Sequence, residues 1–170
     1  MIKRIRYNGE VGEKLITYML DLLEYVHKSK PEQVIFYFSS QGGDAGALPV
    51  LKDIVKDLCN LTDMVIVNYD EVNSAGVNFF MMFDKRKANI ESTFLIHQSS
   101  YDFEGDTADF ILKYVKEGKK HDEQWLSEFL TYCMSYGMSE NEAKKIKRLV
   151  KYGVDYIIFE KEARRFGIVS

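Results

Sequence analysis

The segment VIFYFSSQGG, Val34 to Gly43, decides the fold class of this chain. Its first half is an unbroken run of β-branched and aromatic residues, which is typical of a strand buried on both faces of a parallel sheet. A polar loop with two glycines follows. Apolar residues then recur at helical spacing, at Leu48, Leu51, Val55 and Leu58. The segment therefore predicts a strand, a loop and a helix in succession.

The same alternation continues on both sides of this segment. Met64–Tyr69 and Thr93–Ile96 are further candidates for buried strands, and Ser139 with Glu142 forms a capping box that begins a helix. Strands that alternate with helices predict an α/β fold with parallel pairing. The other expected elements are strands at 2–7 and 154–158, and helices at 12–28, 74–83, about 106–134, about 139–150 and 160–166.

Three strands are followed by residues that are suited to catalysis. These loops read SSQGG, NSAG and HQSS, and in open α/β sheets the ligand lies at the carboxyl ends of the strands. Ser74 is a candidate nucleophile, and His97 is the natural base for it. Backbone amides of Ala75 and of Gly42 or Gly43 are suited to bind a developing oxyanion. The three loops together predict a serine hydrolase.

Each of these signals also has an ordinary explanation. Serines cap helices, a histidine at a strand end is more often structural than catalytic, and two glycines after a strand usually form a turn. The order of the three loops in one chain favours the catalytic interpretation over these alternatives.

Composition narrows the classes of protein. A chain of 170 residues predicts a single domain, and a net charge of −3 with a pI near 5.7 argues against a nucleic-acid partner. There is no long uncharged apolar run and no signal peptide, so we expect no membrane insertion and a cytoplasmic location. Cys59 and Cys133 have no metal-ligand spacing, and we expect two buried thiols and no metal site.

Four segments resemble the proteolytic subunit of the Clp protease, a serine peptidase of the Clp/crotonase superfamily. FYFSSQGGDAGA resembles the family's Y-I-N-S-P-G-G segment, and NSAGVNFFMMFDKRKANIESTFLIHQ resembles its nucleophile-to-histidine segment. YDFEGDTADF and DYIIFEKEARRFGIVS resemble the segments that follow. The resemblance covers the chain from about Ile5 to its end.

The resemblance implies a role for each matching residue. Ser74 would be the nucleophile, His97 the general base and Asp155 the group that orients His97. Gly43, with Gly42 beside it, and Ala75 would supply oxyanion amides. The implied activity is that of a serine endopeptidase, which forms an acyl-enzyme and needs no metal or organic cofactor.

The resemblance also implies a fold and an assembly. The fold would be a Clp/crotonase-like spiral of β-β-α units with a protruding handle helix, at about 104–136 of one domain that spans 1–170. The chain would form homo-oligomeric rings, single or in stacked pairs, that enclose peptide or unfolded protein substrates. A AAA+ unfoldase is a conceivable partner, but a first strand that begins almost at Met1 argues against it.

The chain departs from the family pattern around the predicted nucleophile. Gln41 replaces the proline of S-P-G-G, and Tyr69 to Asn73 replace small residues and a glycine. Two alternatives therefore stay open. One is a catalytically silent scaffold or regulatory subunit of the same fold. The other is a crotonase-type acyl-CoA enzyme, which the presence of both NSAG and IHQ disfavours.

Overall fold

The computed structural model describes residues 1–100 and 107–170, which form two compact units. Unit 1 contains Met1–Leu95, Ile157–Arg164 and Ile168–Ser170, and unit 2 contains Ile96–Tyr156 and Arg165–Gly167. The prediction of one domain over 1–170 stays a prediction.

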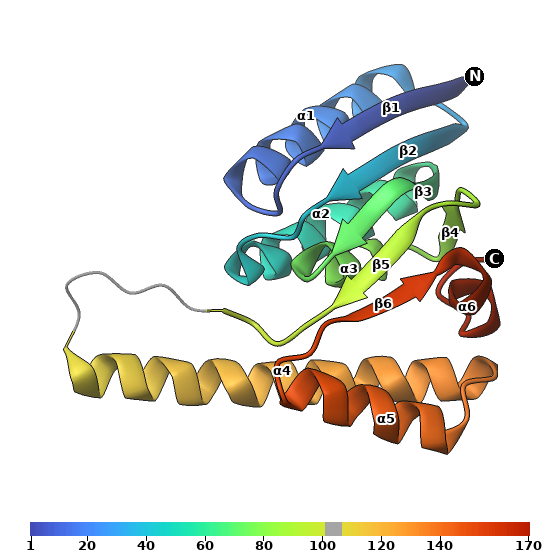
Figure 1. Ribbon diagram of the computed structural model, residues 1–170. Helices are drawn as coiled ribbons and strands as arrows, with labels where there is room; N and C mark the ends of the chain where they lie inside the picture. Colours follow the sequence, from blue (N-terminus) through green and yellow to red (C-terminus); the bar gives the residue numbers. More distant parts are fainter. Residues whose placement is uncertain (101–106) are drawn as a thin grey trace. The chain divides into compact units, whose positions relative to one another are not determined.

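Unit 1 is built on a six-stranded sheet in the order β1-β2-β3-β5-β6, with β4 paired to β3 as well (Figure 1). The pairings of β1 with β2 and of β3 with β2, β4 and β5 are all parallel. The sheet confirms the predicted α/β class. The strands are β1 (Ile2–Asn8), β2 (Gln33–Ser40), β3 (Asp63–Asn73), β4 (Lys85–Ala88), β5 (Thr93–Ile96) and β6 (Tyr156–Phe159).

Helices α1 (Glu13–Ser29), α2 (Leu48–Leu61) and α3 (Ala75–Phe80) lie on one face of this sheet (Figure 1). A short 3₁₀ turn, Ala45–Ala47, leads into α2. Aromatic side chains pack between the sheet and the helices. For example, the ring of Phe38 on β2 lies 5.0 Å from the ring of Phe79 on α3. Full burial of such a side chain contributes about 1.5–3 kcal/mol, so this cluster anchors the helix that follows Ser74.

Strand β3 is longer than predicted. We expected a strand at Met64–Tyr69 and a polar turn after it, but β3 continues to Asn73. The additional residues pair with β5, in which Glu71 lies opposite Thr93. The first half of the same edge pairs with β4, a strand that the sequence analysis missed because KRKA is short and charged.

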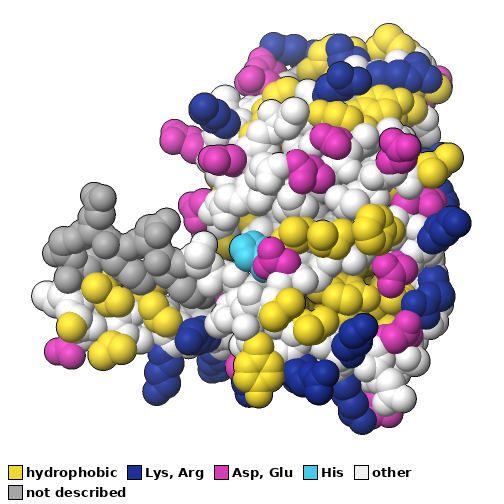
Figure 2. All heavy atoms as spheres, viewed as in Figure 1, with side chains coloured by type: hydrophobic (Ala, Val, Ile, Leu, Met, Phe, Trp, Pro, Cys, Tyr) yellow, Lys and Arg dark blue, Asp and Glu magenta, His cyan; other side chains and the backbone are white. Residues whose placement is uncertain are grey.

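Strand β1 forms one edge of the sheet, and basic side chains protect it. It pairs only with β2 in the described chain, and it carries the basic residues Lys3, Arg4 and Arg6. Figure 2 shows Lys and Arg side chains gathered along the upper margin of the face, where Figure 1 draws β1. Charged residues on an edge strand oppose pairing with another chain.

Unit 2 consists mainly of α4 (Ala108–Tyr136) and α5 (Glu140–Lys151). The predicted capping box is present, since Ser139 Oγ accepts from the Glu142 N–H and the Glu142 carboxylate accepts from the Ser139 N–H. Arg165 also donates to Glu142, and these hydrogen bonds lower the pKa of this carboxyl to about 2. The last helix, α6 (Glu160–Arg165), belongs largely to unit 1.

Helix α4 falls within the region that we predicted as the handle, but its role as a handle stays a prediction. The YDFEGDTADF match and the first residues of that region include 101–106, which lie outside the described residues. None of the helices in the described ranges has the length and apolar character needed to cross a membrane.

Candidate active site

Ser74 occupies a strained turn between β3 and α3. Its φ of 52° and ψ of −126° lie in a region that L residues rarely adopt, and only Lys30 shares a positive φ among the described non-glycine residues. The turn is held from both sides, because the Ser74 N–H donates to Leu95 O at 2.9 Å and the Val77 N–H donates to Ser74 O at 2.9 Å. Strain of this kind costs about 1–3 kcal/mol and is concentrated at functional sites.

The glycine loop after β2 packs directly against this turn. A Cβ atom on Gly42, whose φ is +103°, would lie 2.7 Å from Ser74 Cβ. A Cβ atom on Gly43, at φ +137°, would lie 2.3 Å from the Val11 carbonyl oxygen. Both positions therefore require glycine, both for their φ and for the space available. The structure brings Gly42 against the turn at Ser74, and Gly43 follows it in the same loop, against Val11.

Val11 fixes the same loop, and the sequence analysis gave it no role. Its N–H donates to Gly42 O at 2.7 Å, and its carbonyl oxygen accepts from the Asp44 N–H at 2.9 Å. These bonds form an isolated parallel bridge between Val11 and Gly43. A single bridge leaves no periodic signal in the sequence, so this contact was not predictable from the pattern.

The two loop glycines differ in their backbone amides. The Gly42 N–H donates to Ser40 Oγ at 3.1 Å, so it is already engaged. The Gly43 N–H donates to no protein acceptor in residues 1–100 or 107–170. Ala75 begins α3, and the first amides of a helix have no intrahelical acceptor. Of the two loop amides, that of Gly43 is therefore the one without a protein acceptor in the described residues.

Three polar side chains surround the junction of the loop and the turn. Gln41 Nε2 donates to Glu71 Oε1, and Asn73 Nδ2 donates to Glu71 Oε2 at 2.9 Å. Asn73 Nδ2 also lies 3.5 Å from Gln41 Oε1. This Gln41–Glu71–Asn73 cluster was not predicted from the sequence. A signal was present, because all three residues are departures from the family pattern.

His97 and Asp155 lie in unit 2, whereas Ser74 lies in unit 1. His97 directly follows the last residue of β5 and is partly exposed, and Asp155 directly precedes β6 and is exposed. Within the described part of unit 2, no hydrogen bond joins the His97 and Asp155 side chains. The triad stays a prediction.

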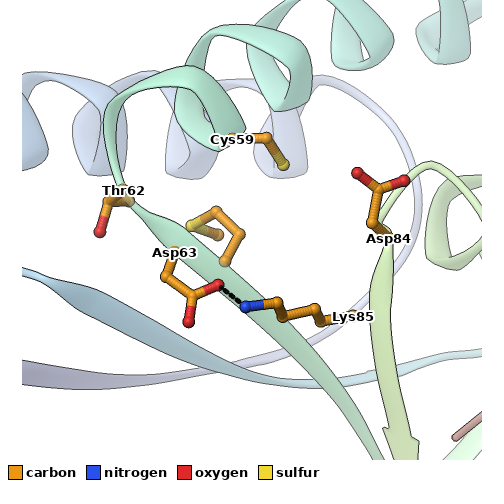
Figure 3. Close-up of a pocket in the computed structure, with 6 residues that line it drawn as sticks. Cys59, Thr62, Asp63, Asp84 and Lys85 are labelled. Atoms are coloured by element: carbon orange, nitrogen blue, oxygen red, sulfur yellow. Dashed lines mark hydrogen bonds and ion pairs between the residues drawn. The ribbon is translucent and has the colours of Figure 1, made fainter.

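The opposite end of β3 holds a small pocket of different character. It has a volume of about 200 Å³ and is lined by Cys59, Thr62, Asp63, Met64, Asp84 and Lys85 (Figure 3). Asp63 accepts from Lys85 Nζ at 2.6 Å, and Figure 3 shows this pair across the pocket from the Cys59 thiol.

Cys59 is exposed, so the expectation of two buried thiols was wrong for it, while Cys133 is buried as expected. Cys59 comes near the end of α2, on the side of that helix that the core does not cover. Partial burial of its thiol raises its pKa, and the carboxylates of Asp84 and Asp63 raise it further. The thiolate is the reactive form, so this pocket is unsuited to a cysteine nucleophile. Among the described residues, no group of three His, Cys, Asp or Glu side chains is arranged to hold a metal ion.

Comparison with known protein families identifies the chain. A model of the family described as Clp protease matches residues 2–170. The chain belongs to the Clp protease family. A search of curated proteins finds no match. The family assignment confirms the resemblance on which the site residues were predicted.

Solved structures show the fold of this family. The chain is similar to the solved structure of a mutant of ClpP1 from Listeria monocytogenes, with a TM-score of 0.72 and 20% sequence identity over 98% of this chain and 88% of that chain. The Clp-type α/β fold is therefore confirmed. The family is one of peptidases, generally of the serine type, whose members form oligomeric rings and act on peptides.

Proposed function

We propose that this chain is a serine endopeptidase with Ser74 as its nucleophile, His97 as its general base and Asp155 as the group that orients His97. The observation that supports this most directly is the strained turn at Ser74. It packs against a loop in which two positions, Gly42 and Gly43, accept only glycine. A sharp turn from strand to helix exposes the nucleophile in other serine hydrolases as well. Membership of the Clp protease family supports the reaction class.

In the proposed reaction, Ser74 Oγ attacks the carbonyl carbon of a peptide bond while His97 accepts its proton. The carbonyl oxygen becomes an oxyanion, to which the N–H groups of Gly43 and Ala75 donate. His97 then gives the proton to the leaving amine, and the C–N bond breaks to leave an acyl-enzyme. Water then takes the place of the amine and attacks the ester carbonyl while His97 accepts its proton. His97 gives this proton to Ser74 Oγ as the ester C–O bond breaks, which releases the acid and restores the enzyme. Each oxyanion donor is worth about 3–4 kcal/mol of the barrier.

The proposal extends to the assembly and its surroundings. We propose that homo-oligomeric rings of this chain enclose a chamber for peptide or unfolded protein substrates in the cytoplasm, and that α4 takes part in the stacking of rings. Exposed apolar side chains at the start of α4 support this, since the rings of Phe110 and Tyr114 stack on each other at 6.1 Å on its surface.

The test is fluorophosphonate labelling of the purified, assembled protein, with the adduct located by mass spectrometry. We expect an adduct on Ser74 that Ser74→Ala and His97→Ala abolish. Ser29→Ala, which removes an exposed hydroxyl at the end of α1, serves as the matched control and should label like the wild type. An adduct on another serine would contradict the assignment.

The departure from the family pattern at Tyr69–Asn73, directly before Ser74, favours a second candidate, the catalytically silent scaffold. A folded, oligomeric sample that forms no adduct with any serine would support it. Asp155→Ala separates the two, because a catalytic Asp155 lowers the labelling rate when removed, whereas a scaffold shows no rate to lower.

A further inference from the structure

We infer that Glu71 is a positioning residue, which holds the Gln41–Gly43 loop in register with the strand end that leads to Ser74. This inference rests on the proposed function, because the geometry that Glu71 maintains matters only if Ser74 reacts. Glu71 itself need not touch the substrate. It would act through Gln41 on one side and Asn73 on the other.

The backbone pairing of β2 with β3 is interrupted at this point. Phe38 pairs with Asn68, and the next pair is Ser40 with Val72, so three residues of β3 lie opposite one residue of β2. A bulge of this kind leaves part of the ladder without its hydrogen bonds. Val11 holds the loop on its other side, but the direct backbone pairing between β2 and β3 is interrupted just before the turn at Ser74.

Side chains connect the two strands there. Asn68 stabilises the bulge itself, since its Oδ1 accepts from the Asp70 N–H at 3.1 Å and its Nδ2 donates to Thr93 O at 2.9 Å. Glu71 then joins the two strand ends, with one carboxylate oxygen bound to Gln41 and the other to Asn73. Hydrogen bonds to a charged acceptor are about twice as strong as neutral ones.

The cluster is directly coupled to the predicted catalytic atoms. Gln41 immediately precedes Gly42, on which an added Cβ would lie 2.7 Å from Ser74 Cβ, and Asn73 immediately precedes Ser74. Asn73 is buried, so its amide cannot exchange its protein acceptor for water without cost. A shift of Gln41 would move the Gly43 amide relative to Ser74 Oγ. Catalysis is sensitive to such shifts, and a displacement of about 1 Å can cost about 100-fold in rate.

Substitutions can separate the hydrogen bonds of Glu71 from its charge. Glu71→Met keeps the length of the side chain and removes both acceptors. Glu71→Gln removes the charge, but the Gln41 amide can rotate by half a turn and accept from the new Nε2 group, so the connection survives. A positioning role predicts that Glu71→Met is impaired and that Glu71→Gln restores most of the rate. A purely electrostatic role predicts that both are impaired.

The first measurement is the second-order rate constant for fluorophosphonate labelling of Ser74 in the assembled full-length chain. We expect Glu71→Met and Gln41→Met each to lower it about 10- to 100-fold, and Glu71→Gln to remain within about threefold of the wild type. The double variant Gln41→Met/Glu71→Met should lose no more than Glu71→Met alone, because Gln41 acts only through its contact with Glu71. Asp70→Asn, which removes the exposed carboxylate next to Glu71, is the control and should be unchanged.

Two labelling results would overturn the inference. One is a Glu71→Met variant that labels within about threefold of the wild type, and the other is a double variant whose loss equals the product of the single losses. A merely structural role would lower the melting temperature and leave the labelling rate of the folded fraction intact, so melting temperatures are measured in parallel.

A second readout does not depend on activity. Hydrogen–deuterium exchange in the peptide that covers residues 39–47 should rise in Glu71→Met and Gln41→Met and stay at the wild-type level in Glu71→Gln and Asp70→Asn. Unchanged exchange in all variants would overturn the inference. If the wild type fails to label, the proposed function fails, and exchange alone then decides whether Glu71 fixes the loop.

Discussion

The two ends of β3 perform different physical tasks. At its amino end, Asp63 binds Lys85 and Gln33 in an arrangement of paired charges and ordinary backbone geometry. At its carboxyl end, the chain carries a bulge, a strained serine and a loop amide without a protein acceptor among the described residues. The first arrangement lowers the free energy of the folded chain, whereas the second raises it. The comparison teaches that strain and unsatisfied donors, more than charges, mark the candidate site in this fold.

The largest expected effect comes from Ser74→Gly, which separates strain from reactivity. Loss of the nucleophile should lower peptidase activity by a factor of at least about 1,000. Glycine adopts a positive φ without the steric cost, so the free energy of unfolding should rise by about 1 kcal/mol after the entropic cost of glycine is subtracted. Peptide hydrolysis and denaturant unfolding measure the two. A less stable variant would contradict the assignment of strain to this turn.

Gly42→Ala tests the close contact between the loop and the turn. The added Cβ would lie 2.7 Å from Ser74 Cβ, and the backbone at φ +103° disfavours alanine. We expect an activity loss of about 100-fold and a destabilisation of about 1–3 kcal/mol, measured by labelling rate and by unfolding.

The matched control for that variant is Gly46→Ala, in the 3₁₀ turn that follows the loop. There the new Cβ would meet only the Asp44 carboxylate, at 3.0 Å from its Oδ1, and the end of a side chain can move aside. A Gly46→Ala variant as impaired as Gly42→Ala would show that the loop as a whole, rather than its contact with Ser74, sets the effect.

At the amino end of β3, Asp63→Asn should change stability modestly and activity not at all. Hydrogen bonds from Lys85 and Gln33 lower the pKa of Asp63 below its ordinary 3.8. Because the pKa of Asp63 is lower in the folded chain than in the unfolded chain, its carboxylate stabilises the fold above pH 3.8. This stabilisation is lost as the pH falls through the pKa of Asp63 in the folded chain. We expect a loss of at most about 1 kcal/mol at pH 7 for this exposed pair, and no difference from the wild type at the lowest pH. Unfolding measured as a function of pH checks this.

Cys59→Ser should have the smallest effect. In the wild type, the pKa of the Cys59 thiol is raised, so its alkylation by iodoacetamide at pH 7 should be slower than that of a free cysteine. The rate should increase as the pH rises. The peptidase activity of Cys59→Ser should stay within about twofold of that of the wild type, since this pocket has no part in the proposed reaction. Rapid alkylation at pH 7 would contradict the raised pKa.

The sequence pattern was sufficient for elements whose own residues form the signal. Apolar spacing located α1 and α2, the buried run at Val34–Phe38 located β2, and the pair Ser139 and Glu142 located the start of α5. It failed where pairing between distant segments decides the structure. The last residues of β3 are polar, and they are strand because β5 lies beside them.

Taken alone, the sequence determined the α/β class, the family and the identity of the candidate residues, because these depend on local periodicity and on motifs a few residues long. Only the tertiary structure decided which loop glycine has a free amide within the described chain, how Val11 holds that loop and how Glu71 joins two strand ends. The contacts of Val11 with the loop and of Glu71 with Gln41 join residues about 30 apart in sequence, and such contacts impose no periodicity that a single sequence displays. The Gly42 amide bonds to the nearby Ser40 Oγ, but through a loop conformation that no periodic pattern specifies.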